Sequence, residues 1–192
     1  MERLTLAMTD RLVARGVVAK EDQAVIRYGL EVMLETVLSY ASILLLAWFM
    51  GDLIETVMFL GAFMALRCYA GGYHASTRWR CYLLSLAMVG IFSLALAWTP
   101  VAWVPALSVG SAGVAVGLVF ALAPVAHPNH PINVQERVQY RRCSRRIVLA
   151  EVAVVLMGTL AFPGSALVGA VALALAASSL SLAAMHVCLK YH

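Results

Sequence analysis

The sequence predicts an all-α, polytopic membrane protein with about six transmembrane helices and an N-terminal amphipathic helix. Only 12 % of its 192 residues are charged and 62 % are hydrophobic, whereas about 25 % of the residues of a soluble domain are charged. The charges are also unevenly distributed, since none occurs from Thr36 to Gly51, from Cys81 to Gln135 or from Val152 to Leu189. A helix needs roughly 20 apolar residues to cross a bilayer, so the two longer runs have room for two spans each.

The first 20 residues predict the amphipathic helix. Leu4, Met8 and Leu12 recur every four residues among charged neighbours, which is the pattern of one apolar helix face. The segment lacks the continuous apolar core and the cleavage site of a signal peptide. It either lies on the inner face of the membrane or packs as an ordinary helix on the cytoplasmic loops, and the sequence leaves both alternatives open.

Turn signals divide the apolar runs into six spans. Gly51-Asp52 separates the first two, the segment TPVAWVP separates the third from the fourth, and Phe162 to Gly164 separates the last two. The predicted spans are Leu30 to Met50, Leu53 to Leu66, 82 to 98, 106 to 123, 147 to 162 and 165 to 187. The second has only about 14 residues, so a tilted or partly buried segment is the alternative there.

Positive charge gathers in alternate connections. Arginines follow the second and fourth spans and Lys190 closes the chain, whereas the other turns have no Lys or Arg. Short cytoplasmic loops collect these residues, so six spans with both termini in the cytoplasm fit every connection. This topology accounts for the net charge of +4, which gives no reason to expect a nucleic acid partner. We interpret residues 1–192 as a single integral membrane domain.

One polar segment, RCYAGGYHASTRWRC from Arg67 to Cys81, stands between two apolar runs. Its Gly71-Gly72 pair permits a sharp turn or the close approach of another backbone. A histidine beside a cysteine can take the thiol proton and leave a reactive thiolate, and His74 and Cys81 are candidates for such a pair. In an unbroken helix they would lie ~10.5 Å apart along the axis. The chain between them must therefore fold back for the pair to work.

Other interpretations of these residues stay open. Cys81 also suits a small apolar helix position, and His74 also suits the membrane interface. A zinc site built from Cys68, His74 and Cys81 lacks a fourth ligand and matches no familiar spacing, so neither a metal nor a cofactor is expected. We interpret Cys68, Cys143 and Cys188 as small packing residues, because no base accompanies them in a motif.

The pattern Rx3GGxHx6C, from Arg67 to Cys81, in a basic loop between two spans, resembles the accessory gene regulator B (AgrB) family of bacterial membrane endopeptidases. Three further segments are also similar to that family: Tyr28 to Glu31, Ala123 to Asn129, and Glu136-Arg137 with the basic cluster after it. The resemblance therefore extends over most of the chain.

The resemblance implies a cysteine endopeptidase whose catalytic pair is His74 and Cys81. In that family the enzyme removes the C-terminal tail of a short, AgrD-like propeptide. It then helps to close the remainder into a thiolactone or lactone ring of the quorum-sensing type. The resemblance also implies a homodimer in the bacterial cytoplasmic membrane, with the active site near the cytoplasmic face and no cofactor.

Four further residues are candidates for substrate or transition-state support. Arg67 is suited to stabilising an oxyanion, favouring the thiolate or holding the peptide, or else to anchoring its helix at the membrane surface. Gly71 and Gly72 provide the fold-back, and the N–H of Gly72 suits an oxyanion hole. Glu31 can orient the histidine or pair with Arg67, although we favour a pair with Arg27, one turn earlier.

Two other functions stay open for this sequence. One is a transporter or exporter whose polar loop gates a path, although the charges that mark such paths are nearly absent from spans three to six. The other is a catalytically silent scaffold or sensor of the same fold. The segment from Arg137 to Arg146, with five arginines, suits a topology anchor and would also attract an acidic peptide tail or anionic lipid.

Overall fold

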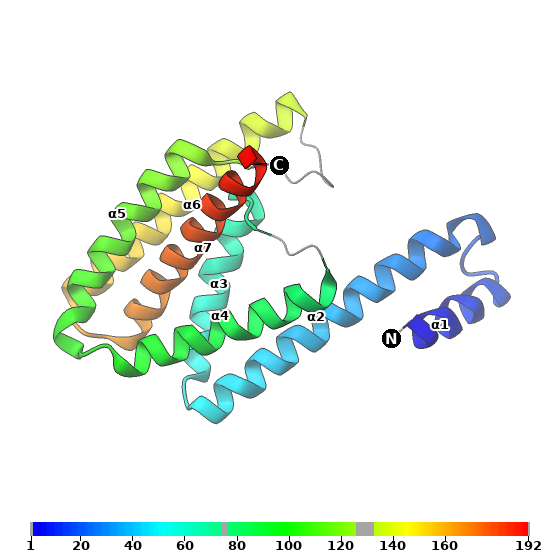
Figure 1. Cartoon of the computed structure of the whole chain (residues 1–192), viewed down its shortest axis with the longest axis horizontal. Coiled ribbons are helices and arrows are strands. Elements are labelled where there is room, and N and C mark those ends of the chain that lie inside the picture. Colours follow the sequence, from blue (N-terminus) through cyan, green and yellow to red (C-terminus); the bar gives the residue numbers. More distant parts are fainter. Residues whose placement is uncertain (1, 74–76, 126–132, 192) are drawn as a thin grey trace. The chain divides into compact units, whose positions relative to one another are not determined.

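The computed structural model describes residues 2–73, 77–125 and 133–191. All regular structure in these ranges is helical, which confirms the predicted all-α fold (Figure 1). The α-helices are α1 (Glu2–Ala14), α2 (Gln23–Met50), α3 (Leu53–Ala70), α4 (Arg78–Trp98), α5 (Val104–Leu122), α6 (Val134–Ala161) and α7 (Ala166–Tyr191). Short 3-10 turns, Lys20–Asp22 and Val101–Trp103, precede α2 and α5.

Among the described residues, five helical segments are long and apolar enough to cross a membrane. They are Lys20–Met50, Leu53–Ala70, Trp79–Trp98, Val101–Leu122 and Ala166–Lys190. These segments correspond to five of the six predicted spans. The second is longer than predicted, because α3 continues to Ala70 and reaches 18 residues, which is within the range of a bilayer-crossing helix.

The remaining predicted span, 147 to 162, lies in α6, which differs from the other long helices. The arginine-rich segment forms its first half and is helical, although the sequence analysis places it between spans. Arginine is a good helix former, and a capping box between Asn133 and Glu136 starts the helix upstream of the arginines. Only Ile147 to Ala161 is left as an apolar stretch, and it includes Glu151. That stretch is shorter than the roughly 20 residues that cross a bilayer.

The first of two compact units, Met1–Leu45, consists of α1 and most of α2. Thr5 and Thr9 of α1 are buried, and Thr5 Oγ1 donates a hydrogen bond to Glu31 Oε1 of α2 at 3.2 Å. The predicted apolar face of α1 is left uncovered within this unit, since Leu4 is 56 % exposed. Helix α1 thus directs polar side chains toward α2 and leaves its own apolar face uncovered. This arrangement favours the membrane-surface alternative for α1.

The second unit, Leu46–His192, is a helical bundle built around α7. Helix α7 contacts α3, α4, α5 and α6, and it lies among α3, α5 and α6 in Figure 1. Half of its apolar segment is buried, against 28 % or less for the other four apolar segments. Leu175 and Leu182 of α7 are fully buried, as are Ala115 and Val119 of α5. Any residue that α7 presents to the bundle is therefore held in a fixed position.

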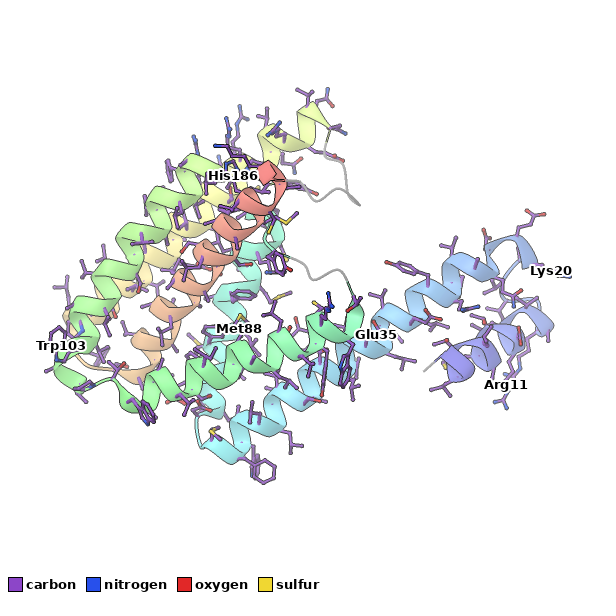
Figure 2. The ribbon with its side chains drawn as sticks, in the orientation of Figure 1. Arg11, Lys20, Glu35, Met88, Trp103 and His186 are labelled. Carbon is purple, nitrogen blue, oxygen red and sulfur yellow. The ribbon has the colours of Figure 1, made fainter. Side chains whose placement is uncertain are left out.

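The two ends of this bundle differ in charge. At one end the α6–α7 turn touches the α4–α5 turn, because a Cβ on Gly164 would overlap Cγ1 of Val101. These turns contain no Lys or Arg. Figure 2 shows Trp103 at this end and His186 at the opposite end. Residues 71–73, which follow α3, and the arginines that bind the end of α5 lie at the end near His186, in agreement with the alternation of charge along the sequence.

Candidate active site

Cys81 lies in the first turn of α4 with its side chain partly exposed. Thr77 caps this helix, since its side-chain oxygen accepts a hydrogen bond from Arg80 N at 3.4 Å. Cys81 N donates to Thr77 O at 3.0 Å, so Thr77 serves as the capping residue of α4. The N–H groups of a first helical turn carry the positive partial charge of the helix. Cys81 therefore lies in the same turn as these N–H groups.

Arg67 lies in the last turn of α3 and not in the loop that the sequence analysis assigns to it, because α3 continues to Ala70. Its guanidinium reaches past the end of the helix. Nη1 donates to Ser181 Oγ of α7 at 2.9 Å, and Nη2 donates to Tyr73 O. A planar guanidinium can bond two such acceptors at once. A helix anchor at the membrane surface needs neither acceptor, so the geometry favours a role for Arg67 in fixing the loop.

The positive charge of Arg67 lies close enough to Cys81 and Cys68 to interact with both thiols electrostatically. The ends of α3 and α4 thus bring a cation and the candidate nucleophile into one neighbourhood. A nearby cation stabilises a thiolate. Cys68 lies on α3 one residue after Arg67 and is exposed. Like Cys81 it interacts with the Arg67 cation, but unlike Cys81 it does not lie at the start of a helix.

Gly71 and Gly72 leave no room for a side chain. Gly71 has φ 83° and ψ −172°, a conformation essentially restricted to glycine, and a Cβ there would overlap Val125 O. A Cβ on Gly72 would lie 2.9 Å from both Arg67 Nη1 and Ser181 Oγ. The sharp turn expected at these glycines is present, and it lets the chain pack against α7 and against the segment that follows α5.

The chain is held on two sides immediately before His74. Tyr73 N donates to both the backbone O and the Oγ of Ser181, each at 3.1 Å, and Val125 N donates to Ala70 O at 3.0 Å. His74 itself lies outside the described residues. The structure therefore fixes the chain up to one residue before the histidine, and the pairing of His74 with Cys81 stays a prediction.

Glu31, in the N-terminal unit, is buried and paired. It is 7 % exposed, and its Oε1 accepts hydrogen bonds from Arg27 Nε at 3.0 Å and from Thr5 Oγ1 at 3.2 Å. The pair with Arg27 that the sequence analysis favours is therefore present, and it accounts for a buried carboxylate. The support role assigned to Glu31 stays a prediction.

In the part of the chain that the structure describes, no group of three His, Cys, Asp or Glu side chains could hold a metal ion. The zinc alternative includes His74 and so falls partly outside those residues. All four cysteines are free thiols. What the described residues offer chemically is a thiol in the first turn of a helix, and an arginine that interacts with it electrostatically and is hydrogen-bonded to the neighbouring loop.

Two arginines of α6 bind the C-terminal end of α5. Arg145 Nη2 donates to Phe120 O at 3.2 Å, and its Cζ lies 4.7 Å from the ring centroid of the same residue. Arg141 Nε donates to Ala123 O at 3.4 Å. These carbonyls carry the negative partial charge of a helix end. The arginine-rich segment thus has a structural role in the bundle, alongside its exposed arginines Arg137, Arg142 and Arg146.

Ser181 contacts both Arg67 and the chain before His74, and it is not among the candidate residues predicted from the sequence. A signal for it is present in the run from Ser178 to Ser181, where three serines interrupt an otherwise apolar helix. Small polar residues in membrane helices often mark close helix packing. The run alone does not distinguish a packing serine from one that bonds a loop.

Comparison with known families finds a relationship over nearly the whole chain. The family model described as AgrB, Accessory gene regulator B, matches residues 6–182, which include Arg67, Cys81 and Ser181. A search of curated proteins and a search of solved structures gave no match. The matched length and the apolar helices agree with a membrane protein of that family. The chain therefore belongs to the accessory gene regulator B family, whose members are membrane proteins of quorum-sensing peptide processing.

Proposed function

We propose that this protein is a membrane cysteine endopeptidase that cleaves the C-terminal tail from a short AgrD-like propeptide and promotes cyclisation of the remainder. Cys81 is the nucleophile and His74 is its base. The observation that carries the proposal is the position of Cys81, in the first turn of α4 and close to the Arg67 cation. Positions at helix N-termini and near cations are typical of reactive cysteines.

The reaction proceeds through an acyl-enzyme. His74 takes the proton of the Cys81 thiol, and the thiolate attacks the scissile carbonyl. The intermediate collapses, the tail leaves as an amine that receives the proton from His74, and a thioester to Cys81 remains. A thiol or hydroxyl of the bound peptide then gives its proton to His74 and attacks this thioester. Cys81 leaves as a thiolate, and the peptide closes as a thiolactone or lactone.

Cyclisation requires that water reaches the thioester more slowly than the peptide's own nucleophile does, since hydrolysis would give a linear acid. A buried backbone next to the reacting residues helps to exclude water. Gly72 is buried, and the chain around it is packed against α7 and the segment after α5. These contacts support a site at the end of the bundle that is screened on one side.

The proposed site lies near the cytoplasmic face of the cell membrane. Both termini lie on that side in the proposed topology, in which α6 crosses the membrane together with the five apolar segments. The support is the charge of the bundle ends, since Arg67, Arg141 and Arg145 lie at the end with the candidate site and positive residues accumulate on the cytoplasmic side. The propeptide would approach along the inner leaflet. We further propose a homodimer as the assembled state, on the basis of the family alone.

The activity is tested by co-expression with a propeptide of the family that carries an affinity tag on its C-terminal tail. We expect released tail together with a peptide product lighter by one water than the linear acid, both identified by mass spectrometry. A transporter or a silent scaffold of the same fold would leave the tagged propeptide intact in the membrane fraction. That outcome, repeated with propeptides of several sequences, would contradict the proposal.

A further inference from the structure

Ser181 joins three parts of the bundle end at one oxygen atom. It lies on α7, the central helix, and its Oγ accepts hydrogen bonds from Arg67 Nη1 at 2.9 Å and from Tyr73 N at 3.1 Å. Arg67 belongs to α3, and Tyr73 belongs to the connection toward α4. Ser181 is separated from these residues by more than 100 positions in sequence, so the contact is created by the fold.

Two further hydrogen bonds of the Tyr73 backbone support the contact between Ser181, Arg67 and Tyr73. Tyr73 N also donates to the backbone O of Ser181 at 3.1 Å, and Tyr73 O accepts from Arg67 Nη2. Both polar backbone groups of Tyr73 are therefore bonded, one to α7 and one to α3. The next residue along the chain is His74. The position from which the histidine begins is thus set by Ser181 and Arg67 together.

The neighbouring serines of α7 do not share this arrangement. Ser179 Oγ donates to Ala176 O of its own helix at 2.9 Å, and Ser178 Oγ is buried without a hydrogen-bond partner in the described structure. Ser178 is 5 % exposed, so its small side chain serves packing. Of these three serines, Ser181 is the one whose hydroxyl bonds to other elements of the described structure.

We propose that Ser181 is a positioning residue of the active site, whose hydroxyl holds Arg67 and the Tyr73 backbone so that His74 can reach Cys81. The proposal rests on the cysteine endopeptidase function proposed above. It assigns to α7, the helix with the most complete burial of the five apolar segments, the task of fixing a loop whose own residues are mostly small and polar. A hydroxyl is needed because one oxygen must accept from two donors.

The test combines two measurements on the full-length protein in lipid nanodiscs. Hydrogen–deuterium exchange of residues 71–73 reports on the Tyr73 amide, and site-resolved iodoacetamide alkylation reports on the thiolate of Cys81. For Ser181→Ala we expect faster amide exchange, by up to about fivefold, because Tyr73 N loses its bond to Oγ and keeps the one to the backbone O of residue 181. We also expect Cys81 alkylation near neutral pH to slow about fivefold, and its pH profile to shift toward that of Cys68.

Two matched variants separate positioning from packing. Ser181→Thr keeps the hydroxyl and is expected to restore both the exchange rate and the pH profile. Ser178→Ala removes a hydroxyl that has no partner, one turn earlier on the same helix, and is expected to leave both unchanged. If Ser181→Ala accelerates exchange but leaves the alkylation profile as in wild type, Ser181 is a structural residue only and the inference is overturned.

A failure of the proposed cysteine endopeptidase function would give a different experimental result. If wild-type Cys81 alkylates no faster than Cys68 at any pH, the activated pair is absent from the resting protein, and the positioning role of Ser181 falls with it. If wild-type Cys81 is activated while Ser181→Ala matches wild type in both measurements, only the inference about Ser181 is wrong.

Discussion

Replacement of Cys81 by alanine is expected to abolish tail release from a co-expressed propeptide, with a fall in rate on the order of 10³-fold or more. Without the Cys81 sulfur no thioester forms, so neither cleavage nor the ring closure that follows it can proceed. Cys81 lies on α4 at a partly exposed position, and alanine is a good helix former. The helix is therefore retained while the chemistry is lost.

Cys68→Ser is the matched control for this substitution. Cys68 also interacts electrostatically with the Arg67 cation and is also a free thiol, but it lies in α3 and not in the first turn of α4. We expect Cys68→Ser to retain tail release within about threefold of wild type, because an exposed surface substitution costs little. Equal losses for the two variants would show that the site needs thiols for folding or packing, and the assignment of Cys81 as nucleophile would be wrong.

Substitution of Gly71 by alanine is expected to remove tail release and to destabilise the end of the bundle by about 1–3 kcal/mol, the cost of forcing a side chain into a backbone region reserved for glycine. Gly71 has φ 83°, and the new Cβ would overlap Val125 O, which is a backbone atom. A backbone atom cannot swing aside as the end of a long side chain can. The chain after α3 must move, and Tyr73 and His74 move with it.

Gly90→Ala is the control for a glycine substitution in the same bundle. Gly90 lies within α4, and a Cβ there would have no heavy atom within 4 Å, so alanine fits and raises helix propensity. Thermal unfolding in detergent and tail release are measured for both variants. Tail release from Gly71→Ala at the wild-type rate would contradict the view that this turn sets the position of the histidine.

Most of the fold can be predicted from the sequence alone, because a chain that crosses a bilayer can adopt few backbone structures. A charge-free run of about 20 residues in a bilayer must be helical, and glycine and proline turns divide such runs. This reasoning locates four helices closely, α2, α4, α5 and α7. It was less accurate for α3 and α6, since an arginine was read as the mark of a loop. Arg67 and the arginines of α6 are helical residues in the structure, because a long side chain can reach past the end of its helix.

The candidate site was only partly predictable. The turn at Gly71 and the place of Cys81 at the start of a helix follow from local sequence, since both depend on neighbouring residues. The partner of Arg67 does not, because Ser181 is 114 residues away in the sequence and is brought to Arg67 only by the packing of α7 against α3. The close approach of Val125 to Gly71 has the same origin.

The central claim is that His74 activates Cys81, and the most direct test measures thiol reactivity without a substrate. The purified protein is alkylated with iodoacetamide over a range of pH, with and without His74→Ala, and each of its four cysteines is quantified by mass spectrometry. The account predicts that Cys81 reacts at lower pH than Cys68, Cys143 and Cys188, and that His74→Ala removes most of this difference. Reaction of Cys81 at the same pH as the other three thiols in both proteins would contradict an activated pair in the resting enzyme.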